Sequence, residues 1–226
     1  IAKAIRKYRP ESIIYAYTNN RSELLKGKSD GIIDIILEGI DSTLSNCDIV
    51  FLCTPVEFND KYLNDIKPYI RNDAIITDVG STKSSIHSLA KELELEDVFI
   101  GGHPMAGSEK TGYDASDALL LENAYYMITP SSKINADKLK AFSVIIESIK
   151  AIPFVIDYKK HDKVVATISH LPHIIAATLV NLVSENDYDD GVMKRVAAGG
   201  FKDITRIASA SPIMWEQICM LNSEPI

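Results

Sequence analysis

Short segments that are apolar at nearly every position alternate with helical patterns between residues 13 and 156 of this 226-residue chain. Strands without polar positions belong to a sheet that is covered on both faces. Strands that alternate with helices indicate βαβ units and a parallel sheet. The predicted strands are 13–17, 47–53, 74–78, 98–100, 124–129 and 152–156, and the predicted helices between them are 22–25, 59–70, 84–95 and 136–149.

Beyond Asp157 the strands stop and a helical pattern begins. Apolar residues recur at spacings of three and four from Val164 to Leu182 and also occupy the opposite face, so this helix is apolar nearly all round. Such a helix is buried on several sides, which predicts an interface with another subunit. Ser211-Pro212 provides an N-cap and a first-turn proline for a later helix. We therefore predict an α/β, doubly wound Rossmann-like parallel-sheet domain over residues 1–158, followed by an all-helical C-terminal domain over residues 159–226.

Charge and composition argue against several classes of partner. The formal net charge of −7 argues against nucleic acid or an anionic membrane, and it leaves any acidic ligand to be held by local cations. No apolar stretch of the sequence approaches the roughly 20 residues of a membrane span, and no signal peptide is visible. The cysteines, Cys47, Cys53 and Cys219, are few and odd in number, which predicts a cytoplasmic location.

The sequence begins with a pattern, Ile1 to Lys7, that is typical of the middle of a helix, so we expect a fragment of a longer protein. A dinucleotide-binding fold normally opens with a strand and a glycine-rich loop that leads into a helix N-terminus. That loop is missing from the sequence. We therefore expect this stretch alone to bind a dinucleotide poorly or not at all.

The glycine-rich stretch from Gly101 to Gly112 contains the strongest candidate for a catalytic group. It follows the apolar residues 98–100, so we predict that His103 emerges where a strand ends. Ligands of parallel α/β sheets bind outside the carboxyl ends of the strands. A histidine there, with an ordinary pKa of about 6.5, suits proton transfer at neutral pH. The alternative is a histidine that caps a turn.

Two further clusters contain candidate functional residues, and for each cluster a purely structural role is the alternative. Ser81 or Thr82 is expected to cap a helix that starts at a strand-to-helix turn. Lys202, Asp203 and Arg206 are spaced three and four apart, which predicts one helix face that is either solvated or lines a cleft. An arginine can hold a carboxylate with two parallel hydrogen bonds, which a lysine cannot do.

Five stretches in order along the chain form a specific pattern: Thr54-Pro55, Asp78-Val79-Gly80-Ser81-Thr82-Lys83, Gly101-Gly102-His103-Pro104-Met105-Ala106-Gly107-Ser108-Glu109-Lys110-Thr111-Gly112, Ser169-His170-Leu171-Pro172-His173 and Gly199-Gly200-Phe201-Lys202-Asp203-Ile204-Thr205-Arg206. This pattern resembles the prephenate dehydrogenase family over nearly the whole chain. The resemblance implies oxidative decarboxylation of prephenate to 4-hydroxyphenylpyruvate in tyrosine biosynthesis, with hydride transfer to NAD(P)+. It also implies a glycine-rich loop before Ile1, more helix after Ile226 and a homodimer formed through the helical domain.

The resemblance also implies individual roles. His103 takes the proton of the substrate's ring hydroxyl, Ser81 lies beside the nicotinamide and that hydroxyl, and Arg206 anchors a carboxylate. The other substrate-binding residues that it implies are His173, Glu109, Ser108, Lys202 and Asp203, and the cofactor-binding residues are Thr18, Asn19, Thr54, Pro55, Gly80 and Ser81. Trp215 is expected in the core. We predict no metal site, because His170 and His173 lack an accompanying set of cysteines or carboxylates.

The sequence leaves more than one cofactor and more than one substrate open. Thr18 stands where an acidic residue would favour NAD, and Arg21 could attract the 2′-phosphate of NADP, so NAD is favoured by the family and NADP stays open. His173 together with Glu109 favours prephenate over arogenate. Other candidates are arogenate dehydrogenase, a hydroxyacid dehydrogenase or imine reductase that uses a lysine of the helical domain, and a dinucleotide sensor without catalysis.

Overall fold

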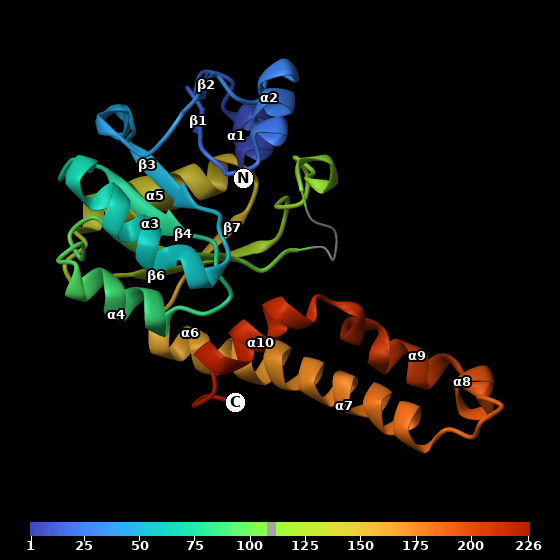
Figure 1. The fold of residues 1–226 in the computed structure, drawn as a ribbon. Coiled ribbons are helices and arrows are strands. Elements are labelled where there is room, and N and C mark those ends of the chain that lie inside the picture. The colour runs from blue at the N-terminus through green and yellow to red at the C-terminus, as the bar shows by residue number, and fades with distance from the viewer. Residues whose placement is uncertain (108–111) are drawn as a thin grey trace. The chain divides into compact units, whose positions relative to one another are not determined.

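The structure is a computed structural model that describes residues 1–107 and 112–226. By its internal contacts the chain divides into two compact units, Ile1–His161 and Asp162–Ile226. The division falls inside a helix, three residues beyond the boundary drawn from the end of the last predicted strand. Figure 1 labels the elements of both units.

The first unit alternates strands and helices. Its strands are β1 (Tyr15–Ala16), β2 (Ile35–Ile36), β3 (Ile49–Leu52), β4 (Ile75–Asp78), β5 (Ile100–Pro104), β6 (Tyr125–Pro130) and β7 (Ile152–Val155). Its helices are α1 (Ala2–Tyr8), α2 (Arg21–Ser29), α3 (Asn59–Ile66), α4 (Ser84–Glu92), α5 (Ala136–Ser148) and the start of α6 (Tyr158–Val165). The predicted Rossmann-like α/β class is confirmed.

Strand pairing is parallel except at one place. β1 pairs with β2, β3 with β4 and β6 with β7 in parallel, and a parallel bridge from Ile76 to Phe99 links β4 to the start of β5. The pair β5 and β6 is antiparallel, with Ile100 opposite Pro130 and Pro104 opposite Tyr126. An antiparallel pair within an otherwise parallel sheet is common in such folds.

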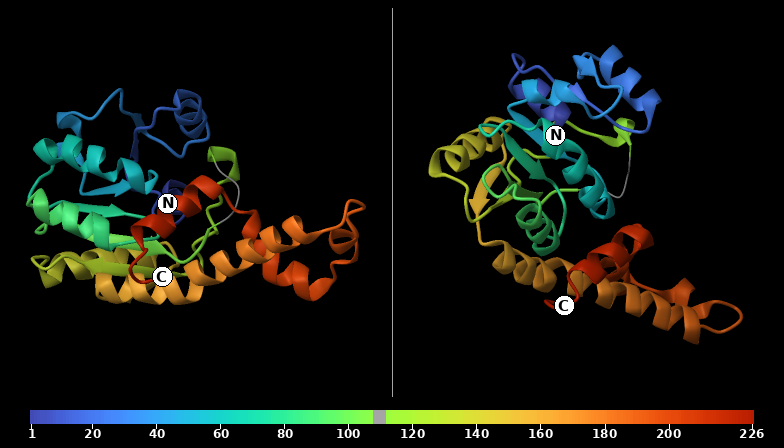
Figure 2. Two further views of the ribbon diagram at one scale, coloured as in Figure 1. Left: turned by 60° about the horizontal axis from the view of Figure 1, so that its bottom comes forward. Right: turned by 60° about the vertical axis from the view of Figure 1, so that its left-hand side comes forward.

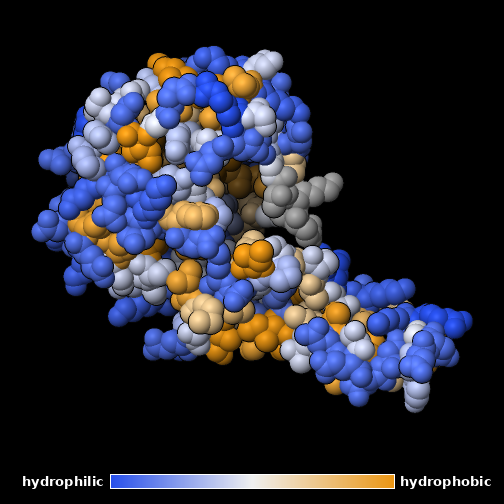
Figure 3. All heavy atoms as spheres, in the orientation of Figure 1, coloured by the Kyte–Doolittle hydropathy of each residue, from blue (hydrophilic) through white to orange (hydrophobic). Residues whose placement is uncertain are grey.

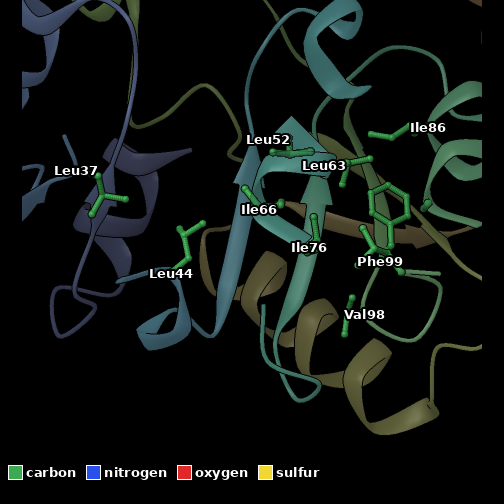
Figure 4. Close-up of a cluster of buried hydrophobic side chains, with 11 residues drawn as sticks. Leu37, Leu44, Leu52, Leu63, Ile66, Ile76, Ile86, Val98 and Phe99 are labelled. Atoms are coloured by element: carbon green, nitrogen blue, oxygen red, sulfur yellow. The ribbon is translucent and has the colours of Figure 1, made fainter. Parts of the chain in front are cut away.

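Helices cover both faces of the sheet. Neighbouring strand residues point to opposite faces, so Ile76 and Phe99 join one buried cluster while Ile75 and Ile100 join the other. The first cluster includes Leu63 and Ile86 of α3 and α4 (Figure 4), and the second includes side chains of α1 and α5. Figure 2 shows α5 across the sheet from α3 and α4. This two-sided burial explains why the strands are apolar at almost every position.

The structure differs from the sequence prediction at β5. The strand was predicted to end at residue 100, whereas it continues to Pro104, so His103 lies within the strand and not beyond its end. The reason is the antiparallel partner, because β6 pairs with every residue from Ile100 to Pro104. The two-residue strand β2 was not predicted, and α2 extends past the predicted helix 22–25.

The second unit is helical. Its elements are the end of α6, a π-helical turn (Ala166–His170), α7 (Leu171–Asn186), α8 (Val192–Val196), α9 (Gly199–Thr205), a 3₁₀ turn (Arg206–Ser209) and α10 (Pro212–Leu221). α7 packs against α8, α9 and the 3₁₀ turn. As predicted, Ser211 caps α10, because its hydroxyl accepts the Met214 amide hydrogen bond at 3.5 Å.

The π turn explains how Pro172 fits into a helix. A proline inside a helix has no N–H to donate and its ring clashes with the carbonyl four residues earlier. The wider turn at Ala166–His170 directly precedes α7, and Pro172 falls in the first turn of α7. The α6, π and α7 segments form one continuous helix, Tyr158–Asn186.

By length and composition alone, that 29-residue helix could cross a membrane, and it is the one such helix in the described part of the chain. The sequence shows no unbroken apolar run of this length, because Ser169, His170 and His173 interrupt it. A single helix of this kind is weak evidence for a membrane span, since helices of protein interfaces share its composition.

The face of this helix that α9 and α10 do not cover remains apolar. Figure 3 shows apolar side chains gathered along this helix near the junction of α6 and α7. Ile168 is 61% exposed, Ile175 49% and Leu182 55%, whereas Ala176 is fully buried. Within the chain the helix is therefore buried on one side, and the interface with another subunit that would cover the other side stays a prediction.

Candidate active site

Asp78, at the carboxyl end of β4, holds the neighbouring strand in place. Its side chain is buried, and Oδ1 accepts a hydrogen bond from the Gly102 amide at 3.1 Å. Oδ2 accepts from the Gly80 amide at 2.8 Å and from the buried ammonium group of Lys83. One carboxylate therefore joins the end of β4, the turn after it and the residue before His103.

The two glycines before His103 are required by close packing. A Cβ atom on Gly102 would lie 2.6 Å from the backbone oxygen of Asp78 and 2.7 Å from the hydroxyl of Tyr126. A Cβ atom on Gly101 would lie 2.3 Å from the hydroxyl of Thr129. Any larger residue would push β5 away from its neighbours, so the glycines serve the approach of the strands.

His103 is half-buried in β5 and contacts a second histidine that the sequence analysis did not single out. Its Nδ1 atom lies 2.9 Å from Nε2 of His161 in α6, and the two rings meet nearly edge-on. His161 is completely buried. Its sequence context, Lys-Lys-His-Asp at the start of a helix, gives no sign of this contact with a residue 58 positions away.

The turn after β4 carries hydroxyl groups that do not cap the following helix. The N-cap residue of α4 is Lys83, without a side-chain cap, so the prediction that Ser81 or Thr82 caps the helix is wrong. The reason is that the turn is closed by Asp78, whose side chain already accepts the Gly80 amide hydrogen bond. Within residues 1–107 and 112–226, the Ser81 hydroxyl makes no hydrogen bond.

Two buried threonine hydroxyls near the carboxyl ends of the parallel strands also lack partners within the described ranges. Thr54 Oγ1, just after β3, and Thr82 Oγ1, after β4, have no hydrogen bond to the described residues. Buried polar atoms are normally paired. Orphaned hydroxyls at the ligand-binding edge of a parallel sheet fit a polar ligand there. Pro55 and Gly80 lie beside them in the chain.

The end of β1 is an exposed polar turn. Thr18 Oγ1 accepts the Asn20 amide hydrogen bond at 3.4 Å, and the neighbouring Asn19 is exposed. Arg21, the first residue of α2, binds the carboxylate of Glu38 through both terminal nitrogens, one of them at 2.9 Å. This hydrogen bonding lowers the pKa of the Glu38 carboxyl and raises that of Arg21.

In the second unit, His173 lies flat on Trp215. The ring centroids are 3.5 Å apart and the rings are nearly parallel. Nδ1 of His173 and Nε1 of Trp215 are buried, and within the described residues neither has a hydrogen-bond partner. Desolvation lowers the pKa of His173 below its ordinary value, so the ring is neutral at neutral pH. Trp215, expected in the core, is only partly buried.

The surroundings of His170 indicate a structural role. It is buried, and its Nδ1 lies 2.9 Å from Nδ2 of Asn222, which also donates to the Asp162 backbone carbonyl at 3.0 Å. Among the residues that the structure describes, no group of three or more histidines, cysteines and carboxylates is arranged to hold a metal ion.

The predicted cationic cluster is exposed. Lys202 and Asp203 lie in α9, and Arg206 is the first residue of the 3₁₀ turn that follows it. The guanidinium of Arg206 has no hydrogen-bond or ion-pair partner in the described ranges, so it is available to an anion. Ser108 and Glu109, both predicted to bind substrate, lie outside the described residues.

Comparison with known proteins decides the family. A family model described as the nucleotide-binding domain of prephenate dehydrogenase matches residues 1–154, and one described as its dimerization domain matches residues 157–226. The chain belongs to the prephenate dehydrogenase family. The resemblance predicted from the five sequence stretches is thereby confirmed.

Individual relatives of the prephenate dehydrogenase family match over the whole chain. The prephenate dehydrogenase of Bacillus subtilis (strain 168) is 38% identical over 230 residues, and the match covers 100% of this chain and 62% of that protein. The chain thus spans 62% of the length of this curated relative.

Solved structures of the family have the same fold. The crystal structure of prephenate dehydrogenase from A. aeolicus in complex with hydroxyphenyl propionate and NAD+ is 32% identical, with a TM-score of 0.91 over 99% of this chain and 78% of that one. The structure of Synechocystis arogenate dehydrogenase is 27% identical, with a TM-score of 0.86 over 99% of this chain and 81% of that one.

Proposed function

We propose that the protein containing this chain oxidises and decarboxylates prephenate to 4-hydroxyphenylpyruvate. The observation that carries the proposal is the placement of His103. It lies near the carboxyl end of β5, and the Asp78 carboxylate that binds the preceding Gly102 amide also closes the β4 turn that contains Ser81. Membership of the prephenate dehydrogenase family supports this reading of the geometry.

The cofactor that we propose is NAD+, which when bound accepts the hydride. The hydroxyls of Thr54 and Thr82, which have no hydrogen-bond partner in the part of the chain that the structure describes, support a polar ligand at this edge of the sheet. We assign its contacts to the turns after β1, β3 and β4, that is to Thr18, Asn19, Thr54, Pro55, Gly80 and Ser81. NAD is favoured over NADP because Glu38 already binds Arg21, the cation that a 2′-phosphate would need.

His103 acts as the general base in this proposal. It accepts the proton of the ring hydroxyl while hydride leaves the same carbon, and Ser81 orients that hydroxyl. The resulting ring carbonyl is conjugated to the carbon that bears the carboxylate, so loss of CO2 yields an aromatic ring. Aromatisation drives the reaction, and the protein has mainly to position groups and accept one proton.

Arg206 holds a substrate carboxylate in this proposal, because it is an exposed guanidinium without a partner in the described residues. We propose that Lys202 and Asp203 support it and that Ser108 and Glu109 contribute from the stretch before Tyr113. His173 is neutral, and its Nδ1 has no hydrogen-bond partner among the described residues, so it would contact the substrate through a hydrogen bond and not as a cation.

We further propose a homodimer formed through the helical domain. The exposed apolar residues of α7, among them Ile175 and Leu182, indicate a protein–protein interface. The matching family model is described as a dimerization domain. Sedimentation of the full-length protein tests this: Ile175→Asp should shift a dimer towards monomer, whereas Ser184→Asn, an exposed polar change on the opposite side of α7, should not. A cytoplasmic location stays a prediction from the cysteine content.

The activity is tested by mixing the full-length protein with prephenate and NAD+ and following the absorbance of reduced nicotinamide. His103→Asn should lower kcat by about 10²–10⁴-fold, the usual worth of a general base, and leave KM and the thermal unfolding midpoint nearly unchanged. Near-normal turnover of this variant would remove His103 from the chemistry. Parallel assays with arogenate decide between the two substrates.

A further inference from the structure

His161 stands in contact with the proposed base, and neither the sequence motifs nor the proposed mechanism gives it a role. We propose that His161 is a positioning residue that fixes the tautomer of His103, an inference that rests on the proposed function of His103 as the base. Its Nε2 atom lies 2.9 Å from Nδ1 of His103, and its side chain is completely buried.

A hydrogen bond between two imidazole nitrogens needs one N–H and one lone pair. If Nδ1 of His103 carries the hydrogen, Nε2 of the same ring has the lone pair and can accept a proton. If Nδ1 is instead the acceptor, Nε2 of His103 carries a hydrogen and cannot act as a base. The direction of this one hydrogen bond therefore decides whether His103 is ready to react.

Proton transfer distinguishes the two directions. Once His103 has accepted a proton, it carries hydrogens on both nitrogens and can only donate. A lone pair on Nε2 of His161 accepts from Nδ1 before and after this step, so no other proton has to move. In the opposite arrangement two N–H groups would face each other after the step. Only His161 as the acceptor is compatible with the reaction.

The elements around His161 hold it in one place. Asp157 caps the start of α6, because its Oδ1 accepts the amide hydrogen bonds of Lys159 and Lys160 at 3.0 Å each. Tyr158 stacks on His87 with ring centroids 4.5 Å apart, which ties α6 to α4. On the other side, Asp78 holds the amide of Gly102. Both imidazoles therefore come from fixed backbone, as a preorganised pair requires.

Two substitutions separate the hydrogen bond from simple packing. In the full-length protein, His161→Leu fills a similar volume but offers no acceptor, and His161→Gln can present its Oε1 atom near the former Nε2. We expect His161→Leu to lower kcat with prephenate by on the order of 10- to 100-fold, the cost of a lost buried hydrogen bond, with KM nearly unchanged. His161→Gln should recover most of kcat. Equal kcat values in the two variants would overturn the proposal.

The tautomer can be measured directly by ¹⁵N NMR of protein labelled in its 5 histidines. The His103 signals are those missing from His103→Asn. We expect hydrogen on Nδ1 of His103 in the wild type and a mixture of tautomers in His161→Leu. Hydrogen on Nε2 in the wild type would overturn the inference even if His161→Leu does not fold. If the wild type does not oxidise prephenate, the proposed function fails, while the spectrum still decides the tautomer.

Discussion

The carboxylate of Asp78 binds the backbone amide of Gly102, at a distance of 3.1 Å, and so connects the end of β4 to the residue before the proposed base. The same carboxylate faces the buried ammonium of Lys83. Stability and alignment of the site thus depend on one buried acidic group.

Asp78→Asn should be strongly destabilising. It removes the negative charge that faces a buried ammonium group, and breaking a buried pair costs about 3–5 kcal/mol. Chemical denaturation measures the loss. Asp73→Asn is the control, since Asp73 pairs with Arg71 on the surface and should cost less than about 1 kcal/mol. Similar losses in the two variants would contradict a structural role for Asp78.

Arg206→Gln should raise KM for prephenate by on the order of 10- to 100-fold while kcat changes much less, because a charged hydrogen-bond partner of the carboxylate is lost. Steady-state kinetics of the full-length protein measure this. Arg195→Gln removes another exposed arginine of the helical unit and should leave KM unchanged. An unaltered KM in Arg206→Gln would exclude Arg206 as the carboxylate anchor.

Glu38→Gln should raise the preference for NADP relative to NAD. Arg21 then loses its charged partner and can bind a 2′-phosphate, with a gain of about twofold to fivefold in the ratio of kcat/KM values, since exposed ion pairs are weak. Glu92→Gln, an exposed change in α4, serves as the control. If the ratio does not move in Glu38→Gln, the Arg21–Glu38 pair has no part in cofactor choice.

His173 should make the protein less stable in acid. Its pKa is lower in the folded chain than in the unfolded one, so folding favours the neutral ring. This stabilisation is complete above the unfolded pKa of about 6.5 and is lost as the pH falls through the folded value. Urea unfolding from about pH 7.5 to about pH 5 should show a smaller loss of unfolding free energy in His173→Gln than in the wild type. Parallel pH curves would contradict this.

Much of the fold could be predicted from the sequence because both sheet faces are covered, which makes the strands apolar throughout. The exceptions have physical reasons. β2 is only two residues long, too short to give a pattern. The continuation of β5 through Gly101, Gly102 and Pro104 contradicts local propensity and is imposed by pairing with β6 and by the Asp78 carboxylate.

Candidate site residues can be named from the sequence where they lie in ordered motifs, and not where their placement depends on tertiary contacts. His103, Ser81 and Arg206 were named from the sequence. His161 was missed because its partner is 58 residues away and its own segment has the composition of an ordinary helix start. The capping prediction for Ser81 and Thr82 was wrong because Asp78, outside the helix, closes that turn.

The π turn at Ala166–His170 has a consequence for every side chain that follows it. One added residue rotates the rest of a helix by roughly 100° about its axis. Deleting a single residue there, such as Thr167, whose hydroxyl bonds to the Lys163 carbonyl, would swing His173 off the face of Trp215. The direction in which the His173 side chain points is therefore set by the preceding turn, whose spacing accommodates Pro172.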